Sequence, residues 1–349
     1  MPVAAMVLMV AALILHQLGI ALVLLSGCAL IGAVFAAVHH AEVIAHYVGE
    51  PFGALLLSLA VTTIEVSLIV SIMLAGGAEK AVLPRDTIFA VVMITCNGLV
   101  GLSFLIGALR HREQAFHVIG SNASLATLIA LTTLTLVLPT FTTSSPGPTY
   151  TGAQLTFASV ISLFLWATFI FVQTVRHRDY FLPVDSRADQ GNHQPRPSAR
   201  STAASFGVLL VALVAVVGLA EAVSPNVEAV VTALGAPTTL VSIAIALLTL
   251  LPEGVAAVRA AVADRVQTSL NLALGSALAS IGLTIPAVAL SSSFLGIPLA
   301  LGLAPKELVL LVLTFLIASI TLVAGRTHVL LGVVHLAIFA AFLFFSALP

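Results

Sequence analysis

The sequence predicts an all-α polytopic membrane protein of about eleven transmembrane helices, an extra first helix followed by two inverted five-helix repeats. First, hydrophobic residues make up 60% of the 349 residues and charged residues only 8%, against about 25% in soluble proteins. Second, the apolar runs are long enough to cross a core of about 30 Å as helices, and no alternating barrel pattern appears. Third, two glutamates lie at matched places in these runs. The net charge of -1 gives no indication of a nucleic-acid partner.

Breaks in hydropathy divide the chain into eleven candidate spans. Their approximate limits are 2–16, 18–38, 51–75, 86–109, 118–139, 152–175, 204–222, 237–258, 266–291, 306–324 and 328–348. The first is short for a bilayer core, so whether residues 2–16 form a full span is left open. Cys28 and Cys96 fall in apolar runs without disulfide or metal spacing, and we expect both to be buried thiols.

One long hydrophilic segment, residues 176–203, divides the chain. It contains RADQGNHQPRPSARS, a composition typical of a flexible linker. Residues 1–17 hold the extra first helix, and residues 18–175 and 204–349 hold five spans each. If the linker is cytoplasmic, all but three of the 13 basic residues lie on the cytoplasmic side of the membrane, and only Lys80, Arg85 and Lys306 lie on the other side. We therefore expect a multi-pass protein of a bacterial-type inner membrane, with a cytoplasmic amino terminus and linker.

Two acidic residues stand apart from the rest. Of the 14 Asp and Glu residues, only Glu65 and Glu253 lie deep in apolar runs, and this division puts the others in loops or at span ends. An ionised carboxylate there costs on the order of 2.5–3.5 kcal/mol. Each follows a Gly-x-Pro by about 20–25 Å of helix, and their helices, five spans apart, cross in opposite directions. The two glutamate-bearing blocks, 49–109 and 235–291, therefore predict an inverted repeat with a site between the halves near the midplane.

Oxygen-bearing side chains share the helix faces of both glutamates. Carboxylate and hydroxyl oxygens are ligands for Na⁺, K⁺ or Ca²⁺ and not for soft metals. Pro252 has no N–H, so it frees the carbonyl of Leu248, as in the broken helices of transporters. The spans that follow each glutamate add an asparagine and serines. The predicted cation- and proton-binding residues are Glu65, Glu253, Thr62, Ser58, Thr249, Asn97 and Ser276, with Glu65 and Glu253 as the metal ligands.

These residues predict a mechanism without a catalytic group. A buried carboxylate takes a proton, and a cation in the same site expels it, so a site exposed to one side at a time exchanges the two. His335, the only histidine well inside an apolar span, is either a structural hydrogen-bonding group or a proton relay. The alternatives are a cation channel, a structural or sensor membrane protein, and an intramembrane enzyme, which would need a nucleophile and base or a metal cluster.

Four stretches of the chain resemble the ChaA-type cation/proton antiporters of the Ca²⁺/cation antiporter superfamily, relatives of the calcium/proton exchangers. They are HHAEVIAHYVGEPFGALLLSLAVTTIEVSLI, PRDTIFAVVMITCNGLVGLSFLIG, LLTLLPEGVAAVRAAVADRVQTSLNLALGSALASIGLTIP and GRTHVLLGVVHLAIFAAFLF. The resemblance extends from about Val38 to Ala347. It implies the exchanger fold and carries the cation-binding role onto Glu65 and Glu253.

The chain departs from the calcium/proton exchangers at several ligand positions. Their G-N-A-x-E run is VTTIE and TLLPE here, so Thr62 and Leu250 replace asparagine, and Ala279 stands where they have glutamine. Ca²⁺ prefers six to eight oxygens, and this chain offers fewer. The resemblance therefore implies exchange of Na⁺, K⁺ or Ca²⁺ for protons with no cofactor beyond these ions. The preferred cation, proton stoichiometry, direction and any homo-oligomer are left open.

Overall fold

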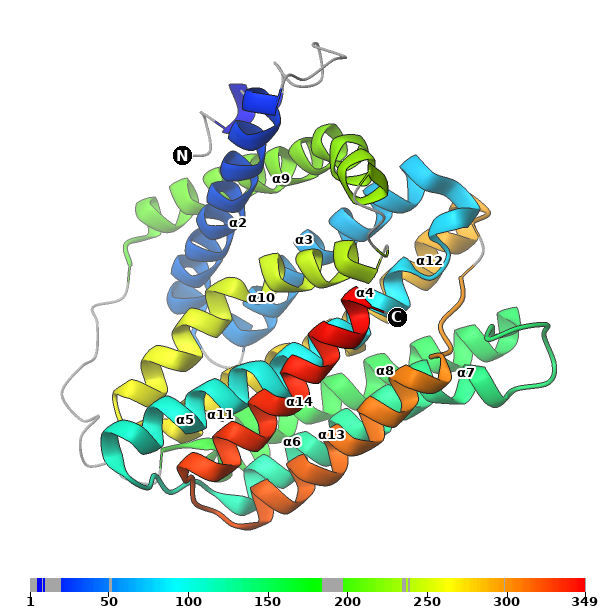
Figure 1. Cartoon of the computed structure of the whole chain (residues 1–349). Helices are drawn as coiled ribbons and strands as arrows, with labels where there is room; N and C mark the ends of the chain where they lie inside the picture. The colour runs from blue at the N-terminus through cyan, green and yellow to red at the C-terminus, as the bar shows by residue number, and fades with distance from the viewer. Residues whose placement is uncertain are drawn as a thin grey trace.

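Helices make up almost all of the chain in the computed structural model (Figure 1). It describes residues 5–7, 9, 20–49, 52–183, 197–233, 237, 239–297 and 299–348. In these ranges nine helices are long and apolar enough to cross a membrane, and α3 (Phe52–Gly76) adds the shorter apolar stretch Leu59–Leu74. The all-α polytopic class is confirmed. Most of the expected first helix, residues 1–17, lies outside the described residues.

The described helices follow the expected spans closely in order and number. In the first half they are α2 (Ile20–Val48), α3, η1 (Gly77–Lys80), α4 (Leu83–Met93), η2 (Ile94–Leu99), α5 (Val100–His111), α6 (Val118–Thr132), η3 (Thr133–Val137), α7 (Leu138–Phe141), α8 (Gly152–Phe171), η4 (Val172–Arg176) and η5 (Arg178–Phe181). In the second half they are α9 (Ala199–Ala233), α10 (Thr239–Val262), α11 (Val266–Ala279), η7 (Ser280–Thr284), α12 (Ile285–Leu295), α13 (Pro305–Val323) and α14 (Val329–Ala347).

Some expected limits were wrong. Helix α2 continues to Val48 instead of ending near residue 38, because it packs against α3 and α9 and its His40 Nδ1 lies 3.1 Å from Ser205 Oγ of α9. Glu42 is therefore inside a helix and not at a span end. Helix α9 begins at Ala199, within the expected linker, whose middle, residues 184–196, lies outside the described residues. Cys28 is exposed, since it lies on the face of α2 turned away from its neighbours, whereas Cys96 is buried as expected.

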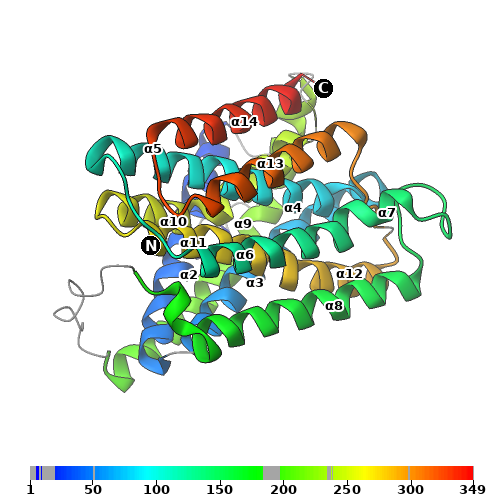
Figure 2. The ribbon, with the colours of Figure 1, turned by 90° about the horizontal axis from the view of Figure 1, so that it is seen from below.

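Two bent composite helices form the centre of the molecule. Segments α4–η2–α5 and α11–η7–α12 each run continuously through a π-helical stretch, η2 or η7. They are the most deeply buried spans, with 83% and 72% of their apolar windows inside the protein, whereas the other spans reach 50% at most. Helices α2 and α9 pack together on one side, while α6, α8 and α13 lie on the opposite side (Figure 1) and face the viewer when the molecule is seen from below (Figure 2).

The two glutamate-bearing helices pack against the opposite halves of the chain. Helix α10 of the second half lies against α4, η2 and α5, and helix α3 of the first half lies against α11, η7 and α12. Helices α3 and α10 also contact each other. The two glutamate helices and the two π-helical stretches therefore meet at the interface between the halves.

Glycines bring the last helix close to this centre. A Cβ atom at Gly101 would lie 2.9 Å from the Cβ of His335, and one at Gly332 would lie 2.6 Å from the backbone nitrogen of Leu105. Helices α5 and α14 can approach this closely only because both positions lack a side chain. This contact brings His335 to the side of η2.

Candidate cation and proton site

Glu65 is fully buried and only partly satisfied. Its Oε2 accepts a hydrogen bond from Ser280 Oγ at 2.9 Å, and Thr284 lies beside the same carboxylate. Both hydroxyls belong to the π-helical stretch η7. Among the described residues, neither Glu65 Oε1 nor the Thr284 hydroxyl has a hydrogen-bond partner. Because an unpaired buried polar atom costs about 1–3 kcal/mol, this oxygen is well suited to receive a proton or a cation.

Glu253 lies near Glu65 on the neighbouring helix. It follows Pro252 inside α10, and its Oε2 is buried without a hydrogen-bond partner in the described part of the chain. Its carboxylate is close enough to those of Glu65 and Glu42 to interact electrostatically with both. The two sequence-predicted glutamates therefore turn inward and lie near one another across the interface between the halves.

The hydroxyls predicted to accompany the glutamates are arranged unequally. Thr62 is buried on the turn of α3 before Glu65. Thr249 is buried on the turn before Glu253, but its hydroxyl donates to the carbonyls of Ile245 at 3.2 Å and Ala246 at 3.1 Å of its own helix. Ser58 belongs to α3, and its side chain lies outside the described residues.

The serine that contacts Glu65 is one turn away from the one predicted. Ser276 is half-buried in α11 and its hydroxyl makes no hydrogen bond among the described residues, so its role in the site stays a prediction. Ser280, four residues further along, donates to Glu65. Both serines are at helical spacing on one stripe of the sequence, so the pattern alone does not distinguish them.

Asn97 belongs to a second buried network. Its Nδ2 donates to Thr314 Oγ1 at 2.9 Å, and its Oδ1 is 3.2 Å from His335 Nδ1. These bonds connect η2 to α13 and α14 and do not involve either glutamate. Asn97 as a cation ligand therefore stays a prediction, with its oxygen already used by a histidine in this structure.

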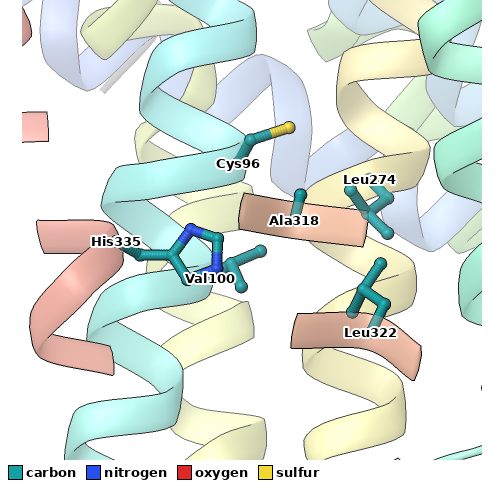
Figure 3. A pocket seen from close by; sticks show the side chains of 6 residues that line it. All are labelled: Cys96, Val100, Leu274, Ala318, Leu322 and His335. Carbon is teal, nitrogen blue, oxygen red and sulfur yellow. The ribbon is translucent and has the colours of Figure 1, made fainter. Parts of the chain in front are cut away.

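His335 is buried and hydrogen-bonded at both ring nitrogens. Since the Asn97 amide donates to a threonine, its oxygen accepts from His335 Nδ1–H, and Nε2 then accepts from Thr321 Oγ1 at 3.1 Å. This assigns a neutral imidazole protonated at Nδ1. The ring borders a small cavity shown in Figure 3, with a free volume of about 10 Å³, the lower limit for one water molecule. The geometry fits the structural role, and the relay role stays a prediction.

Sequence reasoning missed Glu42. It is exposed on α2 and interacts electrostatically with Glu253, which is half-buried with its Oε2 atom fully buried. Hydropathy falls at the histidines before Glu42, which suggested that the span ends there. The sequence therefore offered no indication that Glu42 lies inside a helix. With Glu65, these residues form a series of three carboxylates that runs from an exposed position to a fully buried one.

Comparisons with known proteins agree with this fold. The sodium/calcium exchanger protein family matches residues 18–175 and 204–348. The Sinorhizobium fredii protein y4hA is 48% identical over 336 residues, which cover 96% of this chain and 91% of y4hA. The sodium-potassium/proton antiporter ChaA of Escherichia coli is 35% identical over 326 residues, covering 93% and 88%. In fold, the chain is similar to native YfkE, with a TM-score of 0.75 at 19% identity over 99% and 98% of the two chains.

Proposed function

Because the chain belongs to the sodium/calcium exchanger protein family, we propose that it is a secondary active antiporter exchanging Na⁺, K⁺ or Ca²⁺ for protons. The observation that carries the proposal is the buried carboxylate of Glu65, held at one oxygen by Ser280 and free at the other, with Glu253 nearby. Two acids this close in a protein interior cannot both be ionised without a counter-charge.

The counter-charge explains the exchange. When a cation binds between the carboxylates, their ionised forms are stabilised and protons leave. When the cation leaves, protons must take its place, so the site always carries one or the other. Exposure of this site to one side of the membrane at a time then couples the two flows in opposite directions.

The oxygen set supports a monovalent cation at least as well as Ca²⁺. Two carboxylates with the hydroxyls of Ser280, Thr284 and Thr62 provide a modest number of hard oxygens, and the Thr249 hydroxyl is engaged with its own helix. Ca²⁺ takes six to eight oxygens, so it would need waters or backbone carbonyls in addition. ChaA is named for sodium and potassium exchange, which is the cargo we propose to test first.

The packing of the two halves supports the proposed inverted repeat. Residues 18–175 and 204–349 each contribute a glutamate helix and a composite helix with a π-helical stretch, and each glutamate helix packs on the composite helix of the other half. Rocking of one half against the other would alternate the access to carboxylates at their interface.

The distribution of basic residues supports an inner-membrane location with the linker on the cytoplasmic side. His111 Nε2 lies 2.9 Å from the Val262 carbonyl oxygen, and Arg326 pairs with Glu113 at 3.3 Å, so several arginine-bearing turns meet at one end. At the other end, Arg85 donates to the Gly302 carbonyl at 3.2 Å. We propose that the arginine-rich end faces the cytoplasm.

Transport by reconstituted protein tests the proposal. Proteoliposomes loaded with a pH-sensitive dye receive Na⁺, K⁺ or Ca²⁺ separately, and we expect at least one cation to drive saturable proton movement. Glu65→Gln and Glu253→Gln should reduce the response to that of empty liposomes. Glu113→Gln is the matched control, because Glu113 is an exposed acid paired with Arg326. Cation flux without proton movement would indicate a channel, and normal exchange by both core variants would refute the site.

A further inference from the structure

An apolar groove runs along the outer surface between α10 and η2–α5, separate from the carboxylate site. Its volume is about 470 Å³, within the range of ligand-binding pockets. Leu247, Leu251 and Val255 of α10 border it and are exposed, and Leu99 and Leu102 lie opposite. Figure 1 shows α10 and α5 side by side along this length. All of these side chains present hydrocarbon to the groove.

The length of the groove matches one leaflet of a bilayer. The lining residues of α10 run from Leu247 to Arg259, about 18 Å of helix. Half of a hydrocarbon core is about 15 Å. Gly254 forms part of the floor, where an added Cβ would lie 3.0 Å from Leu99 Cδ2. The missing side chain therefore allows Leu99 to pack closely against α10 at the base of the groove.

One end of the groove carries a positive charge. Arg259 belongs to its lining and is exposed. The hydrogen bond between His111 and the Val262 carbonyl holds the carboxyl-terminal ends of α5 and α10 together, so Arg110 lies at this same end. In the part of the chain that the structure describes, neither Arg110 nor Arg259 forms an ion pair. The groove is therefore apolar along its length and cationic at its end.

We propose that this groove binds an anionic phospholipid, with one acyl chain between α10 and α5 and its phosphate at Arg259. The charge and the length both match this occupant, because basic residues beside apolar clefts between helices bind acidic lipid head groups. A zwitterionic lipid also fits the groove and carries a phosphate, but its own cationic group competes with the arginine for that phosphate, so an anionic lipid is the better match. The inference does not depend on which cation the protein transports.

Native mass spectrometry of protein extracted from nanodiscs tests this assignment. The nanodiscs contain equal amounts of phosphatidylglycerol and phosphatidylcholine with the same acyl chains. We expect the unmodified protein to retain phosphatidylglycerol preferentially. Arg259→Gln should reduce this preference by about five-fold, which corresponds to about 1 kcal/mol. Arg176→Gln, which removes an exposed arginine at the end of η4, is the control and should keep the preference. An unchanged preference in Arg259→Gln would overturn the proposal.

Two further measurements separate the acyl chain from the head group. Leu247→Trp fills the groove without changing charge, so it should reduce the retention of both lipids; equal retention would overturn the proposal. In the unmodified protein, phosphatidylglycerol with a photoreactive acyl chain should label α10 between Leu247 and Val255. Labelling only elsewhere, or displacement of the lipid by millimolar inorganic phosphate, would show that the groove does not hold a lipid chain.

Discussion

The hydrogen bond from Ser280 to Glu65 makes a quantitative prediction. Replacing Ser280 with alanine removes a donor at 2.9 Å from a fully buried carboxylate. A hydrogen bond to a charged group contributes about 1.5–3 kcal/mol, and this contribution applies only when Glu65 is ionised, the form that we propose binds a cation. Ser280→Ala should therefore raise the KM for the cation by at least about ten-fold, the effect of about 1.4 kcal/mol.

The assay is cation-dependent proton movement in proteoliposomes, measured over a range of cation concentrations at one pH. Ser276→Ala is the informative comparison, since Ser276 lies one turn earlier and its hydroxyl makes no hydrogen bond among the described residues. Ser291→Ala is the control for lost hydroxyls, because Ser291 donates only to the Ala287 carbonyl of its own helix. If Ser276→Ala raises the KM more than Ser280→Ala does, the geometry assigned to Glu65 is wrong.

Three other predictions concern the stability and titration of the fold. Gly101→Ala should lower the free energy of unfolding by about 1–3 kcal/mol, because its Cβ would lie 2.9 Å from the Cβ of His335, whereas Gly98→Ala, with its nearest ring atoms at 3.5 Å, should have little effect on the thermal midpoint in detergent. His335→Leu should cost about 2 kcal/mol in the same assay, because both hydrogen-bond partners of the ring become unpaired; a changed pH profile of transport without this loss would support the relay role instead. Burial raises the pKa of Tyr150 to about 12, and its hydroxyl donates to the Leu134 carbonyl at 2.6 Å. Because the folded protein holds this proton more tightly than the unfolded chain, the stability that the protonated tyrosine contributes should be lost between about pH 10 and pH 12. Absorbance at the tyrosinate band should show a late ionisation step in the unmodified protein that is absent from Tyr150→Phe. If the step that Tyr150→Phe removes lies near pH 10, the burial of Tyr150 is contradicted.

Sequence patterns located the glutamates because a charge within an apolar run is conspicuous. Glu65 and Glu253 could be paired without a structure, since their matched distances from Gly-x-Pro and the odd offset of five spans between their helices follow from helix geometry alone. The same logic failed for Glu42. Hydropathy falls at the histidines before it, although packing against α9 continues the helix past them.

The ligand oxygens were harder to predict because they depend on contacts between distant segments. Asn97 was expected near the carboxylates, yet its amide bonds Thr314 and His335, partners on helices near the end of the chain. The π-helical turns of η2 and η7 left no composition signal, and such turns change which face a side chain occupies. Helical periodicity therefore identified the right helices but not the turn whose hydroxyl reaches Glu65.

The order of synthesis adds a consequence to the exchanged packing of the halves. Ser280 is made 215 residues after Glu65. At about 5–20 residues per second, the first half waits roughly 10–40 s before the donor for its acid emerges from the ribosome. During that interval other groups, such as the translocon or water at the membrane surface, must stabilise the Glu65 carboxylate. Biogenesis of this protein should therefore be most vulnerable before its ninth span is inserted.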